Sequence, residues 1–209
     1  MRAIFLDRDG VICENRPNHV KNWGEFEFLP GVKKSLAMLS RLGLPIIIVT
    51  NQAVIGRGMV TVETLEDIHR RMAAEIAAHG GRIDRLIYCP HRPEDECDCR
   101  KPKPGMLLQA AAEMGIDLTQ SYLIGDATSD IQAGQRVGCR TFLVLTGRGV
   151  EQSIPALHSA ERHFVTIASD LREVADHILQ AELNLTAESD QSNSAYRGWY
   201  CQLQAPASS

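Results

Sequence analysis

The sequence predicts an α/β fold in which helices cover both faces of a parallel sheet. Six short apolar runs, each typical of a buried strand, alternate along the chain with segments of helical periodicity. This alternation is typical of βαβ units, where a helix returns the chain to the start of a neighbouring parallel strand. With 209 residues the chain is long enough for one such domain with a continuous hydrophobic core.

The strands are predicted from runs of four to six residues that are too short for helices and rich in apolar side chains. The clearest is PIIIVT at residues 45–50, where three isoleucines and a valine follow one another. The six ranges are 3–6, 45–50, 85–89, 121–126, 140–145 and 163–167.

The helices are predicted from apolar residues at helical spacing and from residues that begin or end helices. Pro30 is placed to begin the first helix and Gly43 to end it, and Thr61 opens the second. The segments are 29–43, 61–81, 105–114, 129–138 and 169–183. We therefore expect one domain over residues 1–183, followed by a polar, aperiodic and disordered tail over 184–209.

Composition excludes several classes of function. A formal net charge of -4 gives no reason to expect a nucleic-acid surface. No apolar run approaches the roughly 18 residues of a membrane span, and Asp7 interrupts the first apolar run too early for a signal peptide. We expect a cytoplasmic monomer that binds a small molecule and neither nucleic acid nor membrane.

Acidic side chains follow two of the predicted strands. Asp7 and Asp9 come directly after the first strand, and Asp126 ends the fourth. Residues i and i+2 of an extended segment point the same way, and ligands of open parallel sheets bind at the carboxyl ends of strands. Crowded carboxylates repel unless a cation or a shared proton offsets them, and such oxygen ligands suit Mg²⁺. The alternatives are an ordinary acidic turn and, for Asp126, a helix N-cap.

Polar side chains also follow the second strand. Thr50, Asn51 and Gln52 place a hydroxyl and two amides at its carboxyl end. These groups can donate hydrogen bonds to a phosphate at the same edge of the sheet. The alternative is a plain turn, since threonine and asparagine are both common in turns.

Three cysteines and a histidine crowd into the short loop 89–99. Cys89, His91, Cys97 and Cys99 form the pattern C-x-H-x5-C-x-C. Disulfides are rare in the cytoplasm, and three thiolates with one imidazole match a closed, tetrahedral structural Zn²⁺ site. The alternative is a set of unrelated buried cysteines. Three further cysteines lack such partners and are expected to be packed or free thiols: Cys13, Cys139 and Cys201.

A basic cluster follows the last cysteine of this loop at once. Arg100 and Lys101 come directly after Cys99, and Lys103 lies two residues further on. A loop tied by a metal ion loses conformational freedom, so both cations at 100–101 are expected to be held near the phosphate-binding strand ends. Lys103 is expected to be exposed to solvent.

Four motifs in order resemble those of the haloacid dehalogenase-like phosphatases. They are DRDG at 7–10, VTN at 49–51, RKPKPG at 100–105 and GDATSD at 125–130, and the resemblance covers roughly residues 1–150. It implies a Rossmann-like sheet with the Asp7 strand at its centre. It also implies Mg²⁺ held by the Asp7 carboxylate, the Asp9 backbone carbonyl and Asp126.

The resemblance further implies the catalytic roles. Asp7 is expected to attack phosphorus and form an aspartyl-phosphate, with Thr50 and Lys101 on the phosphoryl oxygens. Asp9 is expected to protonate the leaving alkoxide and then to activate water, which requires its pKa to lie above the usual value of about 3.9. Asp130 is expected to support the metal ligands.

Within this superfamily the chain looks like the branch that has a short zinc-bound loop in place of a large cap. That branch holds heptose 1,7-bisphosphate 7-phosphatases and histidinol-phosphate phosphatases, and FEFLPGV (26–32) is closer to the former. The resemblance implies sugar-bisphosphate contacts from three segments, with Arg100 on the distal phosphate and Arg57 a weaker candidate. The expected contact residues are Asn15, Asn18, Thr50, Asn51, Gln52, Arg100 and Lys101.

Two departures from the branch pattern leave the exact substrate open. Residues 15–18 read NRPN where an Asp-x-Gly-Tyr-like segment is usual, and Ala127 stands where a lysine often follows the motif aspartate. The leading hypothesis is a Mg²⁺-dependent phosphatase for a heptose 1,7-bisphosphate, and the alternative enzyme is a histidinol-phosphate phosphatase. Hypotheses from other classes are a catalytically silent phosphosugar-binding module and a protein that docks partners through its zinc loop.

Overall fold

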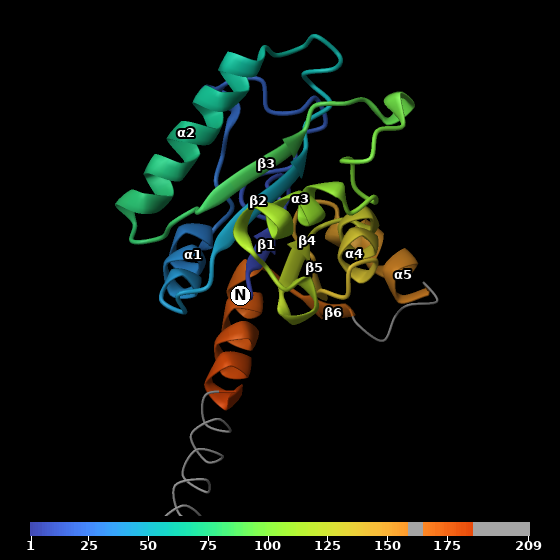
Figure 1. Cartoon of the computed structure of the whole chain (residues 1–209). Coiled ribbons are helices and arrows are strands. Elements are labelled where there is room, and N and C mark those ends of the chain that lie inside the picture. The colour runs from blue at the N-terminus through green and yellow to red at the C-terminus, as the bar shows by residue number, and fades with distance from the viewer. Residues whose placement is uncertain (159–164, 186–209) are drawn as a thin grey trace, which may run out of the picture. The chain divides into compact units, whose positions relative to one another are not determined.

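The computed structural model describes residues 1–158 and 165–185, and its centre is a six-stranded sheet (Figure 1). The strand order is β3-β2-β1-β4-β5-β6, and every neighbouring pair is parallel. This confirms the predicted fold class, including all six strands. Their bounds are β1 Ile4–Leu6, β2 Ile46–Asn51, β3 Arg85–Cys89, β4 Tyr122–Gly125, β5 Arg140–Val144 and β6 Val165–Ala168.

The first strand lies in the interior of the sheet. All three residues of β1 are buried, and they pair in register with Ile46–Ile48 of β2 and with Tyr122–Ile124 of β4. Since the three strands are parallel, their carboxyl ends meet at one edge. The backbone just beyond β1 remains attached to this edge, because the Asp7 N–H donates to the Ile124 carbonyl at 2.9 Å.

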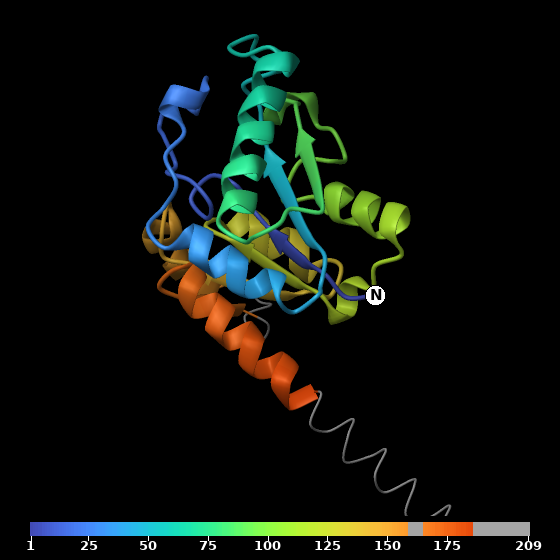
Figure 2. The same ribbon diagram turned by 90° about the vertical axis from the view of Figure 1, so that its left-hand side faces the viewer.

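Helices cover both faces of the sheet (Figures 1 and 2). In the two views α1 and α2 lie on one face, and α3 and α4 lie on the other. The α-helices are α1 Val32–Ser40, α2 Val62–Ala78, α3 Gly105–Met114, α4 Thr128–Gln135 and α5 Gly149–His158. Three short 3-10 helices are η1 Trp23–Glu25, η2 Pro93–Asp95 and η3 Leu118–Gln120.

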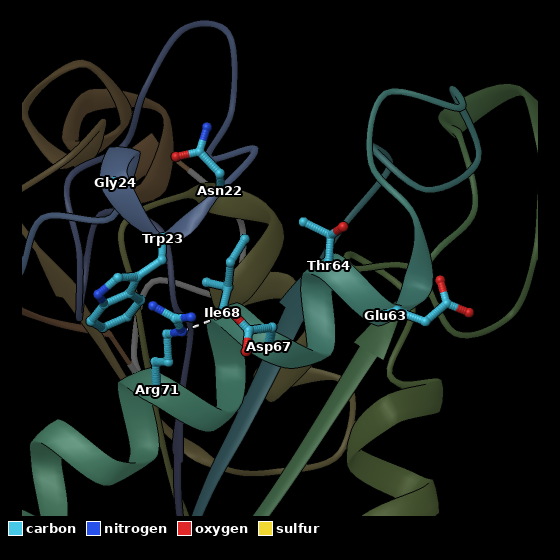
Figure 3. Close-up of a pocket in the computed structure, with 8 residues that line it drawn as sticks. All are labelled: Asn22, Trp23, Gly24, Glu63, Thr64, Asp67, Ile68 and Arg71. Carbon is cyan, nitrogen blue, oxygen red and sulfur yellow. Dashed lines mark ion pairs between the residues drawn. The ribbon is translucent and has the colours of Figure 1, made fainter.

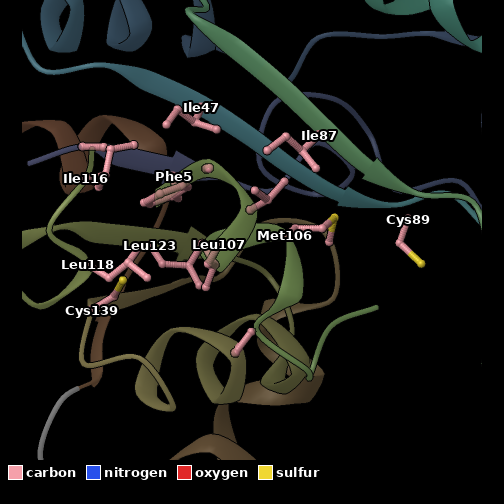
Figure 4. Close-up of a cluster of buried hydrophobic side chains, with 14 residues drawn as sticks. Phe5, Ile47, Ile87, Cys89, Met106, Leu107, Ile116, Leu118, Leu123 and Cys139 are labelled. Atoms are coloured by element: carbon pink, nitrogen blue, oxygen red, sulfur yellow. The ribbon is translucent and has the colours of Figure 1, made fainter. Parts of the chain in front are cut away.

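The core under α3 and α4 follows from the alternation of side chains along the strands (Figure 4). Phe5, Ile47 and Leu123 point to this face and pack against Met106 and Leu107 of α3. Each of these side chains is at most 1% exposed. At roughly 1.5–3 kcal/mol for each large apolar side chain removed from water, this cluster fixes the strands whose ends form the site.

The C-terminal part of the chain differs from the sequence prediction in its helices. Helix α5 was not predicted, because Pro155 lies within it and proline removes a backbone donor in a helix interior. The last helix spans 171–185 rather than 169–183. The chain divides into two compact units, Met1–Ala175 and Asp176–Ser209, and the predicted tail from residue 186 onward lies outside the described residues. In the described ranges no helix is long and apolar enough to cross a bilayer.

Candidate active site

The carboxyl ends of the central strands surround a cavity of about 230 Å³. Side chains from the segment after β1, from β2, from the loop before α3 and from the start of α4 reach this cavity. Its lining residues are Asp7, Asp9, Asn15, Arg16, His19, Thr50, Asn51, Arg100, Lys101, Ser129, Asp130 and Arg148. Residues far apart in the sequence, among them Asp7, Thr50 and Lys101, are therefore brought together at one edge of the sheet.

A buried lysine links the acidic side chains on the floor of the cavity. The Lys101 Nζ lies 3.0 Å from Asp7 Oδ1 and 2.6 Å from Asp130 Oδ1, and it donates to the Val49 carbonyl at 2.8 Å. Burial lowers the pKa of Lys101, but the charges of Asp130 and Asp7 outweigh it and raise that pKa above its ordinary value. The ammonium therefore stays charged and is ion-paired with both carboxylates.

Two glycines leave room for the Asp126 carboxylate. Gly10 has φ +85°, and a Cβ there would lie 2.1 Å from Asp126 Oδ2; Gly147 has φ +57°, and a Cβ there would lie 2.4 Å from the same atom. Any other residue at either position would both strain the backbone and displace the carboxylate. The Asp126 Oδ2 accepts from Asn15 Nδ2 at 3.2 Å and from the Arg148 N–H at 2.9 Å.

The donor set fits a divalent cation. One oxygen from each of Asp7, Asp126 and Asp130 lies within 4.8 Å of the others. Lys101 pairs with Asp7 and Asp130, and Arg148 Nε lies 3.6 Å from Asp126 Oδ2, which leaves the three carboxylates an excess of one negative charge when all are ionised. The buried Asp126 Oδ1 has no hydrogen-bond partner, although buried carboxylate oxygens are normally satisfied. Burial together with the neighbouring acids raises the pKa of Asp126 and raises that of Asp7 to about 6, the crowding that a cation relieves.

Asp9 differs from the expectation made for it. Both of its oxygens accept from the Arg8 guanidinium, at 3.2 and 3.0 Å, and Oδ2 also accepts from Gln52 Nε2 at 2.8 Å. Burial favours the protonated acid, but the Arg8 charge and these hydrogen bonds outweigh burial and lower the pKa of Asp9. In the protein without substrate the pKa of Asp9 therefore lies below its ordinary value, whereas the expected acid role requires a raised pKa when substrate binds.

The Cys/His loop brings its four ligand atoms together at the end of β3. The Sγ of Cys89 lies 3.5 Å from that of Cys97 and 3.7 Å from His91 Nδ1; Cys99 Sγ lies 3.4 Å from Cys97 Sγ and 3.2 Å from the same His91 nitrogen. A tetrahedral ion with metal–sulfur distances of about 2.3 Å requires sulfur–sulfur edges of roughly 3.7 Å. The cluster thus has nearly the dimensions of a single closed metal site, and its sulfurs are too far apart for a disulfide bond.

Comparison with known proteins supports the same assignment. Residues 98–174 match the model of the HAD-hydrolase-like family. A Pseudomonas aeruginosa protein, D-glycero-β-D-manno-heptose-1,7-bisphosphate 7-phosphatase, is 38% identical over 85% of this chain and 97% of its own length. The chain belongs to this phosphatase family. Like its relatives, it is a phosphatase enzyme.

Solved structures of the heptose-bisphosphate phosphatase family share the fold. The Bordetella bronchiseptica enzyme, determined with magnesium and phosphate, superposes with a TM-score of 0.82 at 35% identity, covering 87% of this chain and 99% of that one. The Burkholderia thailandensis enzyme superposes with a TM-score of 0.67 at 31% identity, covering 86% of this chain and 99% of that one. The phosphatase function and the family predicted from the sequence are confirmed.

The predicted substrate residues of this family member divide into two groups. Asn15, Thr50, Asn51, Arg100 and Lys101 line the cavity. Asn51 also holds the Lys101 backbone in two hydrogen bonds of 3.1 Å each.

The other predicted residues do not line the cavity. Gln52 is turned away from it and bonds to Asp9, Thr50 and Arg8. Asn18 is exposed, and Arg57 reaches the His19 ring, at 3.2 Å.

The structure also tests the expectations for a helix cap, for Lys103 and for the remaining cysteines. Asp126 does not cap α4, since the N-cap residue is Ala127 and Asp130 Oδ2 accepts its N–H at 3.1 Å. Lys103 is only 43% exposed, and it donates to the Glu96 carbonyl at 2.9 Å and to Asp98 at 3.0 Å. Of the remaining cysteines Cys13 and Cys139 are buried free thiols, and Cys201 lies outside the described residues.

Several residues at the site were not predicted from the sequence. His19 and Arg148 line the cavity and were not expected there. Arg16 also lines it, but it lies within the segment 15–18 from which substrate contacts were expected. Beneath Asp9 lie Arg8, which is 1% exposed, and His69 of α2, which is 7% exposed. Only Arg8 had a signal in the sequence, as a cation between two aspartates on a buried strand end.

A second hollow lies between the segment 22–24 and α2 (Figure 3). The Trp23 ring lies beside the Arg71 side chain, whose Nε pairs with Asp67 at 2.8 Å. Only two acids line this hollow, Glu63 and Asp67, and in the described part of the chain they belong to no group of three metal-ligating side chains. The chemistry of the family is therefore assigned to the cavity at the strand ends.

Proposed function

We propose that the protein hydrolyses the 7-phosphate of D-glycero-β-D-manno-heptose 1,7-bisphosphate in a Mg²⁺-dependent reaction. The observation on which this depends is the buried Lys101 ammonium, 3.0 Å from Asp7 Oδ1, beside the unpaired Asp126 Oδ1. This arrangement supports a site for one cation and one phosphoryl group next to a carboxylate nucleophile. The names of the relatives supply the substrate.

The residues that would hold Mg²⁺ are the Asp7 and Asp126 carboxylates together with the Asp9 backbone carbonyl, supported by Asp130. Bound there, the ion would neutralise charge on the phosphoryl oxygens and on the crowded acids. Mg²⁺ prefers one or two protein carboxylates and oxygen atoms of the substrate. The unpaired oxygen of Asp126 and the excess negative charge fit this preference.

The reaction divides into two displacements at phosphorus. In the first, an Asp7 oxygen forms a bond to phosphorus while the bond from phosphorus to the sugar oxygen breaks. Lys101 and the Thr50 hydroxyl hold the phosphoryl oxygens as negative charge spreads over them. Asp9 must first take up a proton, because Arg8 lowers its pKa in the free protein, and it then delivers that proton to the departing alkoxide. In the second, water attacks the aspartyl-phosphate and gives its proton back to Asp9, which frees Asp7 and inorganic phosphate.

The four ligands in the loop 89–99 would hold Zn²⁺ in a structural role. Three thiolates and one imidazole fill all four positions of a tetrahedral ion, so no position is left for substrate or water. The loop is connected to the cavity through Arg100, whose NH1 donates to the His91 carbonyl at 3.2 Å. A bound ion would thus help to orient Arg100 toward the distal phosphate of the substrate.

We further propose that the enzyme acts as a monomer in the cytoplasm. The five cysteines of the described ranges are free thiols, which suits a reducing compartment, and three of them belong to the Cys/His loop. Gel filtration of the purified protein tests the monomer.

The substrate is tested by assaying two phosphate esters side by side. We expect a higher kcat/KM for heptose 1,7-bisphosphate than for histidinol phosphate, and activity should disappear when EDTA removes Mg²⁺. A higher kcat/KM for histidinol phosphate would assign the alternative enzyme. Binding of the heptose bisphosphate without turnover in saturating Mg²⁺ would assign the silent binding module.

A further inference from the structure

A buried cation connects Asp9 to a residue that does not reach the cavity. The Arg8 guanidinium donates to both Asp9 oxygens, to Gln52 Oε1 at 3.1 Å and toward His69 Nε2 at 3.0 Å. Gln52 Nε2 in turn bonds to Asp9 Oδ2 and to Thr50 Oγ1, at 2.8 and 2.9 Å. The network therefore runs from α2 through the end of β1 to the cavity.

The chemistry of the two side chains fixes the direction of the central bond. Arginine has only donors and does not lose its proton in proteins. The Nε2 of His69 must therefore accept, which leaves the proton of the neutral ring on Nδ1. Burial and the Arg8 charge lower the pKa of His69 to about 3, in agreement with a neutral ring.

The position of Arg8 depends on this acceptor. The side chain is 1% exposed, so a donor that lost its partner would find no water in its place. A buried unpaired donor costs about 1–3 kcal/mol, and more when it carries charge. Without the His69 nitrogen, Arg8 would turn to find another acceptor, and the Asp9 carboxylate bound to its other edge would turn with it.

We propose that His69 is a positioning residue for the reaction, because through Arg8 it sets the orientation in which Asp9 transfers a proton to the leaving oxygen. This inference rests on the role of Asp9 in the proposed function. His69 itself does not line the cavity, and its contact to the site runs through Arg8.

The test uses two phosphate esters that differ in their need for an acid. Cleavage of a sugar phosphate releases an alkoxide, which is a poor leaving group and needs a proton. Cleavage of p-nitrophenyl phosphate releases a stable phenolate, which needs little proton transfer. The value of kcat/KM reports formation of the aspartyl-phosphate. His69→Leu removes the acceptor, His69→Gln retains one in its Oε1, and Asp9→Asn serves as the reference for loss of the acid.

We expect Asp9→Asn to lower kcat/KM for the sugar phosphate about 100-fold more than for p-nitrophenyl phosphate, since general-acid catalysis contributes about 10²–10⁴-fold. His69→Leu should lower kcat/KM for the sugar phosphate about 10-fold more than for p-nitrophenyl phosphate. His69→Gln should restore most of the kcat/KM for the sugar phosphate. Equal losses on both substrates, or no loss in a folded His69→Leu protein, would overturn the positioning role. An unselective Asp9→Asn would instead overturn the proposed role of Asp9.

A second measurement does not depend on the folding of His69→Leu. In ¹⁵N-labelled wild-type protein, with the His69 signal assigned by its loss in His69→Gln, the ring should carry its proton on Nδ1 at neutral pH. A proton on Nε2 would exclude the hydrogen bond from Arg8 and with it the proposal.

Discussion

The acidic cluster at the strand ends and the Cys/His loop are both ligand sets, but they are built differently. The acidic cluster consists of Asp7, Asp126 and Asp130 with Lys101, all at most 6% exposed, and its members come from segments that only the parallel sheet brings together. The Cys/His loop takes its four ligands from residues 89–99, and His91 is exposed.

This difference assigns the reaction to the acidic cluster and a structural role to the Cys/His loop. The acidic cluster is held by buried strands, by close-approaching glycines and by Lys101, so its geometry does not need the ion. The Cys/His loop is polar and has few apolar residues to hold it, so we expect its shape to depend on the proposed metal ion. Changes in the acidic cluster should therefore abolish turnover and preserve the fold, while changes in the loop should weaken the structure first and activity second.

The largest expected effect is that of Asp7→Asn. Removing the nucleophile should lower kcat by about 10⁴-fold or more. Stability should not fall, because burial and the neighbouring acids already disfavour a charged carboxylate there and raise the pKa of Asp7 to about 6. Steady-state kinetics and thermal melting measure both. The matched control is Asp67→Asn, on the surface of α2, which should keep full activity; near-normal turnover of Asp7→Asn would exclude Asp7 as the nucleophile.

A pH effect on stability should trace to the buried His69. Its pKa is lowered to about 3 in the fold from 6.5, so the unfolded chain binds the proton more tightly. The stability from this neutral ring is full above about pH 6.5 and is lost as pH falls from there toward about pH 3. Between pH 7.5 and pH 5.0 the loss should be about 2 kcal/mol.

Denaturant unfolding of wild type and His69→Gln at both pH values measures this loss. The stability difference between the two proteins should shift by that amount, in favour of His69→Gln at the lower pH. A pH-independent difference would show that His69 is not held as a neutral acceptor.

Loss of the loop metal should have a smaller effect on activity than on structure. Cys97→Ser should lose bound zinc, melt at a lower temperature and raise KM about 10-fold, as the whole segment that carries Arg100 loses its fixed position. The change in kcat should be smaller, because Lys101 keeps its contacts to Asp7, Asp130 and Val49. Metal analysis and kinetics measure these effects, and Cys139→Ser should retain its zinc. Normal kinetic constants in a zinc-free Cys97→Ser protein would favour a docking role for the loop.

The smallest expected effect is the change in KM when either of two cations next to the Cys/His loop is removed. Arg100 lines the cavity, whereas Lys103 bonds to Glu96 and Asp98. Arg100→Ala should raise KM several-fold with little change in kcat, the result of losing contacts made equally in ground and transition states. Lys103→Ala should change KM less than about two-fold. A larger effect at Lys103 would mean that the loop, and not a direct contact, determines substrate binding.

The acidic cluster was predictable from the sequence because parallel topology gives the strand ends a common edge. Apolar runs locate the strands, so the pattern alone places Asp7, Thr50 and Asp126 at their carboxyl ends. The Cys/His loop was predictable for another reason, since its ligand types and their short spacing indicate a metal without reference to the rest of the fold.

The network beneath Asp9 could not be predicted, because it depends on contacts between distant segments. Arg8 and His69 are 61 residues apart, and helical periodicity marks His69 only as one position on the buried face of α2. Gln52 was likewise predicted to contact the substrate, although its side chain bonds to Asp9 and Thr50. Arg148 follows β5, whose end gave no polar signal, and its backbone N–H donates to Asp126.

The covalent intermediate on Asp7 is tested most directly by stopping the reaction with acid during turnover and mapping the bound phosphate by mass spectrometry. Tryptic cleavage after Arg2 and Arg8 releases the peptide of residues 3–8, which contains Asp7 as its only acidic residue. We expect one added phosphoryl group on this peptide in the presence of Mg²⁺ and none with EDTA. A phosphoryl group on another residue, or turnover with no labelled peptide, would contradict the assignment of Asp7 as nucleophile.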